Sequence, residues 1–286
     1  MAFNSVRDVV RAWEEGRCWN SFIHKTSTPT PSALRWADMS MGAGIPIYNA
    51  YVGAQLEATA LTGQKNQGVF TGPPMTADQK RYLVQVSLAS PQTTNGPPYD
   101  YILADYLMFY PLIDGDSTDQ QDMANDISLP RYSDGKGVKA FMVITTPMGT
   151  DGDVTIGYTD ADGVDRSLTT RIGVSSTVGV ITNGGAAGVT VTRALAPFIP
   201  IPQDGVRKIN YVTNLSAMGG FYAICLCKPL TTLMQREALT MTEKCLVSQQ
   251  TTMPRIYPGA YLNFLMFANN SGNPSTVRGQ LDFITE

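Results

Sequence analysis

The stretch that decides the fold class is Tyr261-Leu-Asn-Phe-Leu-Met-Phe-Ala268, which lies close to the end of a chain of 286 residues. Apolar side chains occupy both faces that an extended backbone would present, whereas a half-exposed strand alternates apolar with polar residues. Such a run is typical of a strand buried on both sides. It predicts one apolar set on each face, Leu262, Phe264 and Met266 on the first and Tyr261, Leu265 and Phe267 on the second.

A second strand is predicted directly after the first. The cluster Asn269-Asn-Ser-Gly-Asn-Pro-Ser275 is rich in residues that favour turns. Thr276–Ile284 then alternates, as a half-buried strand does. Its apolar face carries Val277, Leu281 and Phe283, and its polar face carries Arg278, Gln280 and Asp282. The chain is therefore expected to end inside a sheet.

Further strands are predicted throughout the chain, separated by turn signals. The clearest hairpin is Asp153–Ile172, with Asp162-Gly163 at its turn. Tyr101–Ile113 is predicted as a long apolar strand broken at Pro111, with a helical start as the alternative, and Leu230–Thr242 is ambiguous between strand and short helix. Many short strands of this kind predict a mainly β protein with a β-sandwich or jelly-roll architecture.

One short helix is expected at the N-terminal end. Ser5 suits an N-cap, Gly16 suits the C-terminal stop, and Val6, Val9, Val10 and Trp13 follow each other at helical spacing. The segment from His24 to Ser32, rich in Thr and Pro, predicts an extended N-terminal arm.

The arm carries the candidate partner interface, which consists of Trp13, Trp19, Arg35 and Trp36. Tryptophan and arginine are the side chains most often found in interface hot spots. The alternative is that these residues fold back onto the protein's own core. On the interface interpretation, replacing Trp13 or Trp36 by Ala weakens binding of the partner and leaves the protein folded.

Three segments are predicted along the chain. They are an N-terminal helix and arm at 1–45, a β-rich region at 46–150 and a β-sandwich region at 151–286, with a single domain as the alternative.

The charge pattern argues against two classes of partner. Charged residues make up 16% of the chain and the formal net charge is −3. No basic stripe follows from this sequence, so we expect no nucleic-acid partner. No apolar run reaches the roughly 18 residues of a membrane span, so we expect no membrane insertion. A low charged fraction favours a protein whose surface is partly covered by neighbours.

No catalytic or metal site is indicated by the chemically active residues. The single histidine, His24, has no nucleophile motif beside it, and Cys225 and Cys227 lie on one face of an apolar run without further metal ligands. Of the two acidic loops, Asp114–Asp119 lacks the glycine and terminal glutamate of a calcium loop, and Asp160–Asp165 is explained by its turn. We therefore expect no enzymatic activity, no cofactor and no bound metal.

Several fragments, in their order along the chain, carry a family resemblance. They are Gly16-Arg-Cys-Trp19, Leu34-Arg-Trp-Ala-Asp-Met-Ser40, Leu129-Pro-Arg-Tyr-Ser-Asp-Gly135, Thr155-Ile-Gly-Tyr-Thr-Asp-Ala-Asp-Gly-Val164, Phe198-Ile-Pro-Ile-Pro-Gln-Asp-Gly-Val-Arg207, Cys227-Lys-Pro-Leu230 and Met253-Pro-Arg-Ile-Tyr-Pro-Gly-Ala-Tyr-Leu262. Together they resemble a group of virion structural proteins of tailed bacteriophages.

What the resemblance implies is a β-rich protein bound to the capsid surface of a virion and made in the host cytoplasm. The expected role is that of a decoration (cement) protein, with the major capsid protein and copies of itself as partners. Two alternatives remain open: a tail or head–tail component, and a module that recognises carbohydrate or a host. For the second alternative, Tyr99–Tyr110 and Asn269–Asn273 are the segments suited to sugar stacking.

Overall fold

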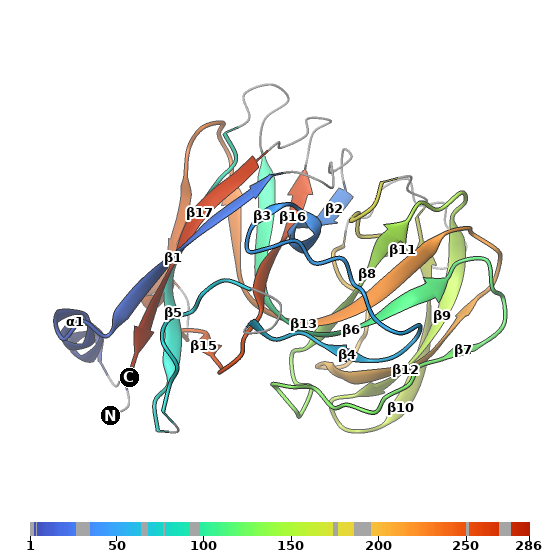
Figure 1. Ribbon diagram of the computed structural model, residues 1–286, viewed down its shortest axis with the longest axis horizontal. Coiled ribbons are helices and arrows are strands. Elements are labelled where there is room, and N and C mark those ends of the chain that lie inside the picture. Colours follow the sequence, from blue (N-terminus) through green and yellow to red (C-terminus); the bar gives the residue numbers. More distant parts are fainter. Residues whose placement is uncertain are drawn as a thin grey trace.

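The computed structural model describes residues 3, 5–26, 35–63, 68–76, 78–91, 98–173, 177–185, 196–249, 252–268 and 276–286. The prediction of a mainly β protein with a short N-terminal helix is confirmed (Figure 1). The helical elements are α1 (Val6–Glu14), a 3₁₀ turn (Met39–Met41) and α3 (Leu246–Gln249). The strands are β1 (Cys18–Thr26), β2 (Arg35–Asp38), β3 (Gly44–Ile45), β4 (Thr59–Ala60), β5 (Arg81–Ala89), β6 (Tyr99–Asp114), β7 (Gln121–Asp122), β8 (Lys139–Thr146), β9 (Gly152–Asp160), β10 (Asp165–Ile172), β11 (Asn183–Gly185), β12 (Val206–Asn214), β13 (Phe221–Gln235), β14 (Thr242–Cys245), β15 (Arg255–Ile256), β16 (Leu262–Ala268) and β17 (Thr276–Thr285).

Eight of these strands form four nested antiparallel pairs. The outermost pair is β1 with β17, and the next pairs inward are β2 with β16, β5 with β14, and β6 with β13. Two further pairings, β17 with β5 and β16 with β6, join the four pairs side by side. A ribbon of nested pairs rolled up in this way is a jelly roll.

Rolling the ribbon produces two sheets that face each other. The first sheet has the order β14-β5-β17-β1-β3, with β15 also paired to β5. The second has the order β2-β16-β6-β13-β8, with β4 also paired to β6. Between them lies a core that takes Leu83, Val86 and Leu88 from the first sheet and Tyr101 and Phe264 from the second.

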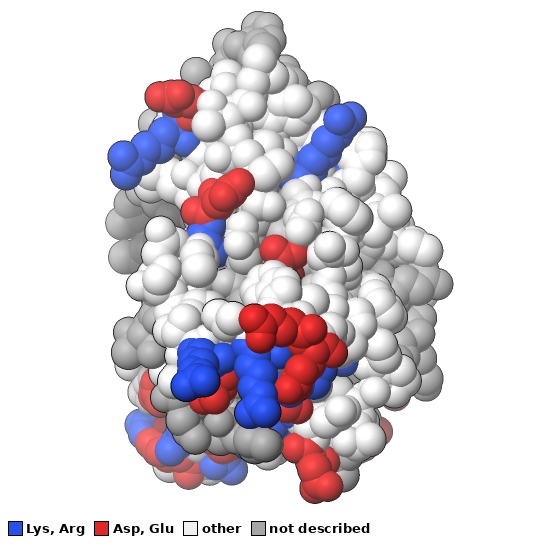
Figure 2. All heavy atoms as spheres, turned by 90° about the vertical axis from the view of Figure 1, so that its left-hand side faces the viewer, with Lys and Arg blue, Asp and Glu red and all other residues white. Residues whose placement is uncertain are grey.

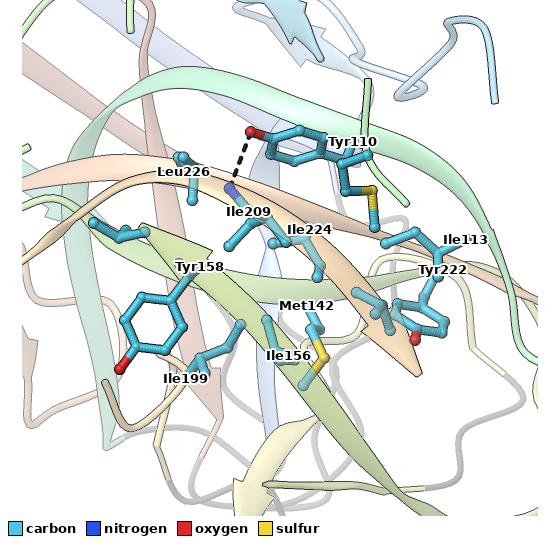
Figure 3. Close-up of a cluster of buried hydrophobic side chains, with 14 of the residues drawn as sticks. Tyr110, Ile113, Met142, Ile156, Tyr158, Ile199, Ile209, Tyr222, Ile224 and Leu226 are labelled. Carbon is cyan, nitrogen blue, oxygen red and sulfur yellow. Dashed lines mark hydrogen bonds between the residues drawn. The ribbon is translucent and has the colours of Figure 1, made fainter. Parts of the chain in front are cut away.

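A third sheet is inserted between β6 and β13 in the sequence. Its order is β11-β10-β9-β12-β7 (right-hand side of Figure 1). It packs against β8 and the adjoining parts of β6 and β13, which extend beyond the jelly roll. Figure 3 shows this core, in which the hydroxyl of Tyr110 on β6 accepts a hydrogen bond of 3.1 Å from the backbone N–H of Ile209 on β12.

One face of β6 contributes to two cores, one under the first sheet and one under the third. Tyr99, Tyr101 and Leu103 belong to the core under the first sheet, and Met108 and Tyr110 to the core under the third. The core-facing residues change from odd to even numbers because the pairing with β13 shifts register between Tyr106 and Met108. A bulge adds one residue, so it restores the same face to the second half of the strand.

The opposite face of the second sheet is also buried. Its core contains Ala104, Tyr106 and Phe109 from β6, and it is covered by Tyr51 and Leu61 from the segment that follows β2. Both faces of this sheet are therefore apolar.

The prediction for β16 is confirmed. All seven of its residues are buried. Leu262, Phe264 and Met266 lie in the core under the first sheet, and Leu265 and Phe267 lie with Tyr261 in the core on the opposite face.

The prediction for β17 is confirmed as well. Val277, Leu281 and Phe283 are buried in the jelly-roll core, whereas Arg278 is exposed. β17 lies between β1 and β5, so this strand occupies the interior of the first sheet.

Helix α1 forms at the predicted place. The Ser5 side chain accepts a hydrogen bond from the backbone N–H of Asp8, and the Asp8 side chain accepts one from the backbone N–H of Ser5, which completes a capping box. Gly16 follows the helix with a φ of +71°, a conformation that favours glycine. The predicted apolar face is divided, because Val9 is buried whereas Val6, Val10 and Trp13 are exposed.

The predicted strand break at Pro111 is wrong, and the ambiguity at Leu230–Thr242 is resolved in favour of a strand. β6 continues through Pro111, because Pro111 and Leu112 fall where its register with β13 shifts, and the missing N–H costs no ladder hydrogen bond. The ambiguous segment Leu230–Thr242 holds no helix; β13 extends to Gln235, past a similar register shift beside Pro229.

The Asp153–Ile172 hairpin is confirmed as β9 and β10, with Gly163 at φ +82° in the turn. The extended conformation predicted from His24 onward is confirmed as far as Thr26, and residues 27–34 lie outside the described residues. The division at 45 and 150 stays a prediction; the pairing of β1 with β17 and of β6 with β13 crosses these positions.

Phe267→Asp should prevent folding or lower the free energy of unfolding by about 4 kcal/mol or more, because it places a carboxylate in an apolar core. Phe267 is 7% exposed and its ring centroid lies 5.3 Å from that of Trp36. Urea unfolding measures the effect, with Phe267→Leu as the size-reduced apolar control. A soluble, fully folded Phe267→Asp monomer would identify this face as an interface instead.

Candidate partner interface

The four residues of the candidate interface lie on two different sheets. Trp13 is on α1 and Trp19 is on β1, both at the first sheet, whereas Arg35 and Trp36 are on β2 at the edge of the second sheet. The sequence gives no signal for this separation, because it follows from the assignment of β1 and β2 to opposite sheets.

Trp13 and Trp19 line a shared surface groove of about 260 Å³. Its other lining residues are Cys18, Asn20 and Asp282. Trp13 is 46% exposed, because α1 turns it away from the sheet. This groove offers an aromatic surface bordered by one amide and one carboxylate.

The Trp19 ring is also in contact with Arg81. The Arg81 guanidinium lies 4.9 Å from the centroid of the Trp19 ring, within the range of a cation–π contact. Arg81 also donates hydrogen bonds to the Thr285 hydroxyl (3.2 Å) and the Pro73 carbonyl (2.7 Å). The contact orients Trp19 from within the fold, and burial lowers the pKa of Arg81.

Trp36 is accounted for by the protein's own core. Its side chain is 7% exposed and packs against Phe267, while β2 pairs with β16 in the register Trp36 opposite Phe267. Arg35 is half-buried at the start of the same strand, and burial lowers its pKa. Trp36 therefore fits the alternative to the interface interpretation, namely that it packs into the protein's own core.

Fifteen large apolar side chains are exposed among the described residues, and they lie on several parts of the fold. Eight of them lie on α1, on β1 and in and after β3: Val6, Val10, Trp13, Phe22, Ile45, Ile47, Tyr48 and Val52. The other seven are Phe70, Leu112, Val164, Leu215, Met234, Leu239 and Met241. Figure 2 shows the side of the molecule on which α1 lies; charged side chains of both signs gather in its lower part, at the height of α1 in Figure 1, and larger uncharged areas lie above them. Exposed apolar side chains beside uncharged surface are typical of a protein-binding face.

The last residue of β2, Asp38, is a buried carboxylate that the sequence analysis did not identify as important. Asp38 accepts hydrogen bonds from the hydroxyls of Ser40 (2.6 Å), Tyr51 (2.5 Å) and Tyr106 (2.7 Å), and from the backbone N–H of Ser40 (2.9 Å). Burial raises the pKa of Asp38, and these hydrogen bonds act in the opposite direction. With three side-chain donors bound, Asp38 joins β2, β6 and the segment after β2.

Lys25 is the corresponding buried cation. Its ammonium donates to the Gly42 carbonyl at 2.9 Å, and the residue has no exposed surface. Burial lowers the pKa of Lys25 to about 8, against the opposing effect of the Asp38 charge. A second buried carboxylate, Asp105, is paired with Arg131 at 2.8 Å. Lys25 joins β1 to the loop after the 3₁₀ turn, and Arg131 joins the segment after β7 to β6.

The residues considered for chemistry are dispersed. His24 is exposed on β1, Cys225 and Cys227 are buried on one face of β13 as predicted, and all four cysteines are free. Among the described residues, no group of three or more His, Cys, Asp or Glu side chains could hold a metal ion. Within the same ranges, no helix is long and apolar enough to cross a membrane.

The two acidic loops are stabilised by their own hydrogen bonds. The Asp160 carboxylate accepts from the backbone N–H groups of Asp162 and Val164, both at 2.9 Å, which supports the interpretation of this segment as a turn. In the other loop, the Asn214 side chain donates to the carbonyls of Asp114 (2.7 Å) and Ser117 (2.8 Å).

The aromatic segment proposed for sugar stacking is not available on the surface. Tyr99, Tyr101, Tyr106 and Tyr110 are all fully buried, because β6 is covered on both faces. The other segment, Asn269–Asn273, lies outside the described residues.

No family model matches this chain, and no curated protein matches it. Among solved structures it is similar to T=1 particles derived from infectious bursal virus, at 10% identity and a TM-score of 0.17, over 94% of this chain and 77% of that chain. It is also similar to the infectious bursal disease virus Gt strain (13% identity, TM-score 0.19) and to the VP2 subviral particle of that virus (9% identity, TM-score 0.19), in both cases over 94% of this chain and 80% of the other. TM-scores this low do not establish a common fold, so the assignment of the jelly roll rests on the strand pairing.

Trp36→Ala should lower the free energy of unfolding by about 3 to 5 kcal/mol, because it leaves a cavity beside Phe267. Trp13→Ala should lower it by less than about 1 kcal/mol, because the side chain is half exposed. Chemical denaturation of the two variants measures the difference. Equal losses would contradict the division of these tryptophans into a core residue and a surface residue.

Lys25 should make a contribution to the free energy of unfolding that rises with pH between about 8 and about 10.4. Below this window Lys25 is protonated in both states, and the folded state bears the cost of burying its charge. Within the window the folded state loses the proton first, so the Lys25 contribution grows by about 3 kcal/mol. Burial raises the pKa of Cys225 and of Cys227, so these two thiols act in the opposite direction at the same pH, and the Lys25 contribution is measured as a difference between variants.

The difference in unfolding free energy between the wild-type chain and Lys25→Met should change by about 3 kcal/mol across this window. The difference between the wild-type chain and Lys136→Met, a substitution at an exposed position, should stay constant. Urea unfolding of the three proteins across the window provides the comparison, and a constant difference for Lys25→Met would contradict the assignment to Lys25.

Proposed function

We propose that this chain is a structural protein of a virus particle, bound to the capsid surface as a decoration protein that stabilises the shell. The observation that carries the proposal is the group of exposed apolar side chains on α1, on β1 and around β3, beside the first sheet of a jelly roll. Jelly rolls occur in viral capsid and lectin domains and in cupins, and a fold alone does not specify one of these functions.

The surface features favour the virion role over the other two. A lectin-like role would need exposed aromatic side chains, and the tyrosines of the aromatic segment Tyr99–Tyr110 are buried on β6. A cupin-like enzyme would draw on a cluster of histidines, and the sequence has one histidine, exposed on β1. Exposed apolar residues on α1, β1 and the segment around β3 support contacts with protein neighbours instead.

The physical basis of such a role is repetition of a modest interface. A standard protein interface buries about 1,600 Å² in total, and symmetry multiplies that area over the particle. The proposed partners are the major capsid protein and further copies of this chain. No enzymatic step, nucleic acid or membrane enters the proposal.

A second candidate is that the chain itself builds the shell. The nested strand pairing is the observation behind this candidate, because viral capsid domains are among the proteins built on jelly rolls. A tail or head–tail position remains the third arrangement.

Stepwise dissociation of purified particles distinguishes these arrangements. A decoration protein should leave the particle under mild denaturant while the shell stays closed in electron micrographs, and purified protein should rebind to the stripped shell. Release that coincides with collapse of the shell would support the second candidate and contradict decoration. Absence of the protein from purified particles, measured by mass spectrometry, would overturn the virion role.

A further inference from the structure

The exposed side of α1 carries an apolar stripe that no described part of the chain covers. Val6 is 65% exposed, Val10 50% and Trp13 46%. The spacing of these residues, four and then three positions, places them in one row along a helix. Val9 and Ala12, about a quarter turn around α1 from this stripe, pack on the first sheet in the cluster that contains Val84 and Ile284. The stripe therefore lies beside the contact with the sheet and stays open to solvent.

Two unpaired charges border this stripe on one side. Arg7 and Glu14 are seven positions apart, which is two helical turns, so both lie along the same edge of the row. The other charges near the helix are satisfied internally: Arg11 pairs with Glu15 at 3.2 Å, and Arg17 pairs with Glu15 at 2.8 Å. Among the described residues, neither Arg7 nor Glu14 forms an ion pair.

This pattern is complementary to itself in one orientation. When two such helices pack antiparallel about a two-fold axis, equal edges face each other, and Arg7 of one helix lies opposite Glu14 of the other, twice. Parallel packing about a two-fold axis would place each residue at the same height as the same residue of the other helix, so Arg7 would not lie opposite Glu14. A two-fold contact uses the same patch on both copies, as this patch requires.

We propose that α1 binds α1 of a second copy of this chain, antiparallel, with the two-fold axis near Val10. Val6 of each copy then packs beside Trp13 of the other, at the groove formed with Cys18, Trp19, Asn20 and Asp282. Arg7 of each copy pairs with Glu14 of the other. The inference goes beyond the proposed function, because it specifies a contact that a free dimer would also make.

The size of the contact sets its expected strength. A helix of nine residues is about 13 Å long. One helix pair buries less than the roughly 1,200 Å² at which stable interfaces begin. The dimer in solution is therefore weak and depends on protein concentration, and the same contact gains strength where a particle holds two copies side by side.

Charge reversal tests the orientation. Arg7→Glu and Glu14→Arg should each raise the dimer dissociation constant roughly tenfold, because one substitution turns two attractive pairs into repulsive ones. The double variant Arg7→Glu/Glu14→Arg should restore the original constant, because it exchanges the charges within each pair. Glu237→Arg is the matched control, an exposed site in the turn after β13 with the same change of charge. Sedimentation velocity over a wide concentration range measures all four variants.

Rescue by the double variant supports the antiparallel pair. A double variant as weak as either single variant, or a wild-type chain that stays monomeric at every concentration, overturns the proposal. Circular dichroism confirms that each variant is folded, so a loss of the dimer is separated from a loss of the helix.

Disulfide trapping locates the axis. In a Cys18→Ser/Cys245→Ser background, Val10→Cys should form a covalent dimer under oxidised glutathione, because the two-fold axis brings the two thiols together. Arg11→Cys, exposed on another side of the same helix, should not. Equal trapping at both positions would contradict the proposed axis. The result does not depend on a particle, so failure here and failure of the virion role are distinguishable.

Discussion

The structure depends on pairing between strands that are far apart in the sequence. β1 and β17 pair over nine residues, from Cys18 opposite Ile284 to Thr26 opposite Thr276, and three further pairs nest inside them. Loop-closure entropy must be overcome before such contacts form, so they require a large apolar gain. β16 supplies part of that gain, because it is the strand that buries all its side chains between two cores.

The second sheet connects the jelly roll to the third sheet. β6 and β13 run through both sandwiches, and the bulge beside Leu107 keeps one face of β6 directed to the core in each half. The inserted third sheet is thereby fixed to the jelly roll by continuous strands rather than by a linker. The first sheet, in contrast, carries α1 and part of the exposed apolar surface, at the end of the protein away from the third sheet (Figure 1).

Local patterns predicted much of this fold. The double-sided apolar run at Tyr261–Ala268, the alternation at Thr276–Ile284 and the capping signals at Ser5 each specify their element through neighbouring residues alone. The strand break expected at Pro111 was wrong, because a register shift there removes the need for the proline N–H, and such a shift depends on the partner strand. The segment Leu230–Thr242 was ambiguous for the same reason, because β13 passes Pro229 at a similar shift. Sheet membership is likewise not local, so the sequence could not show that Trp19 and Trp36 lie on different sheets.

The candidate interface could be predicted only in part. Tryptophan content directed attention to the N-terminal end of the chain and gave Trp13 and Trp36 equal weight, because exposure depends on which side of α1 or β2 meets a sheet. The exposed apolar stripe on α1 emerged only once Val9 and Ala12 were seen to be the residues that contact Val84 and Ile284.

A cryo-electron microscopy reconstruction of the purified particle tests the central claim, that this jelly roll is a repeated structural unit of a virion. The account predicts density for both sandwiches at symmetry-related positions on the shell, with the first sheet and α1 turned toward neighbouring protein. Density for the protein with α1 and the first sheet facing solvent, or no such density on the particle, would contradict it.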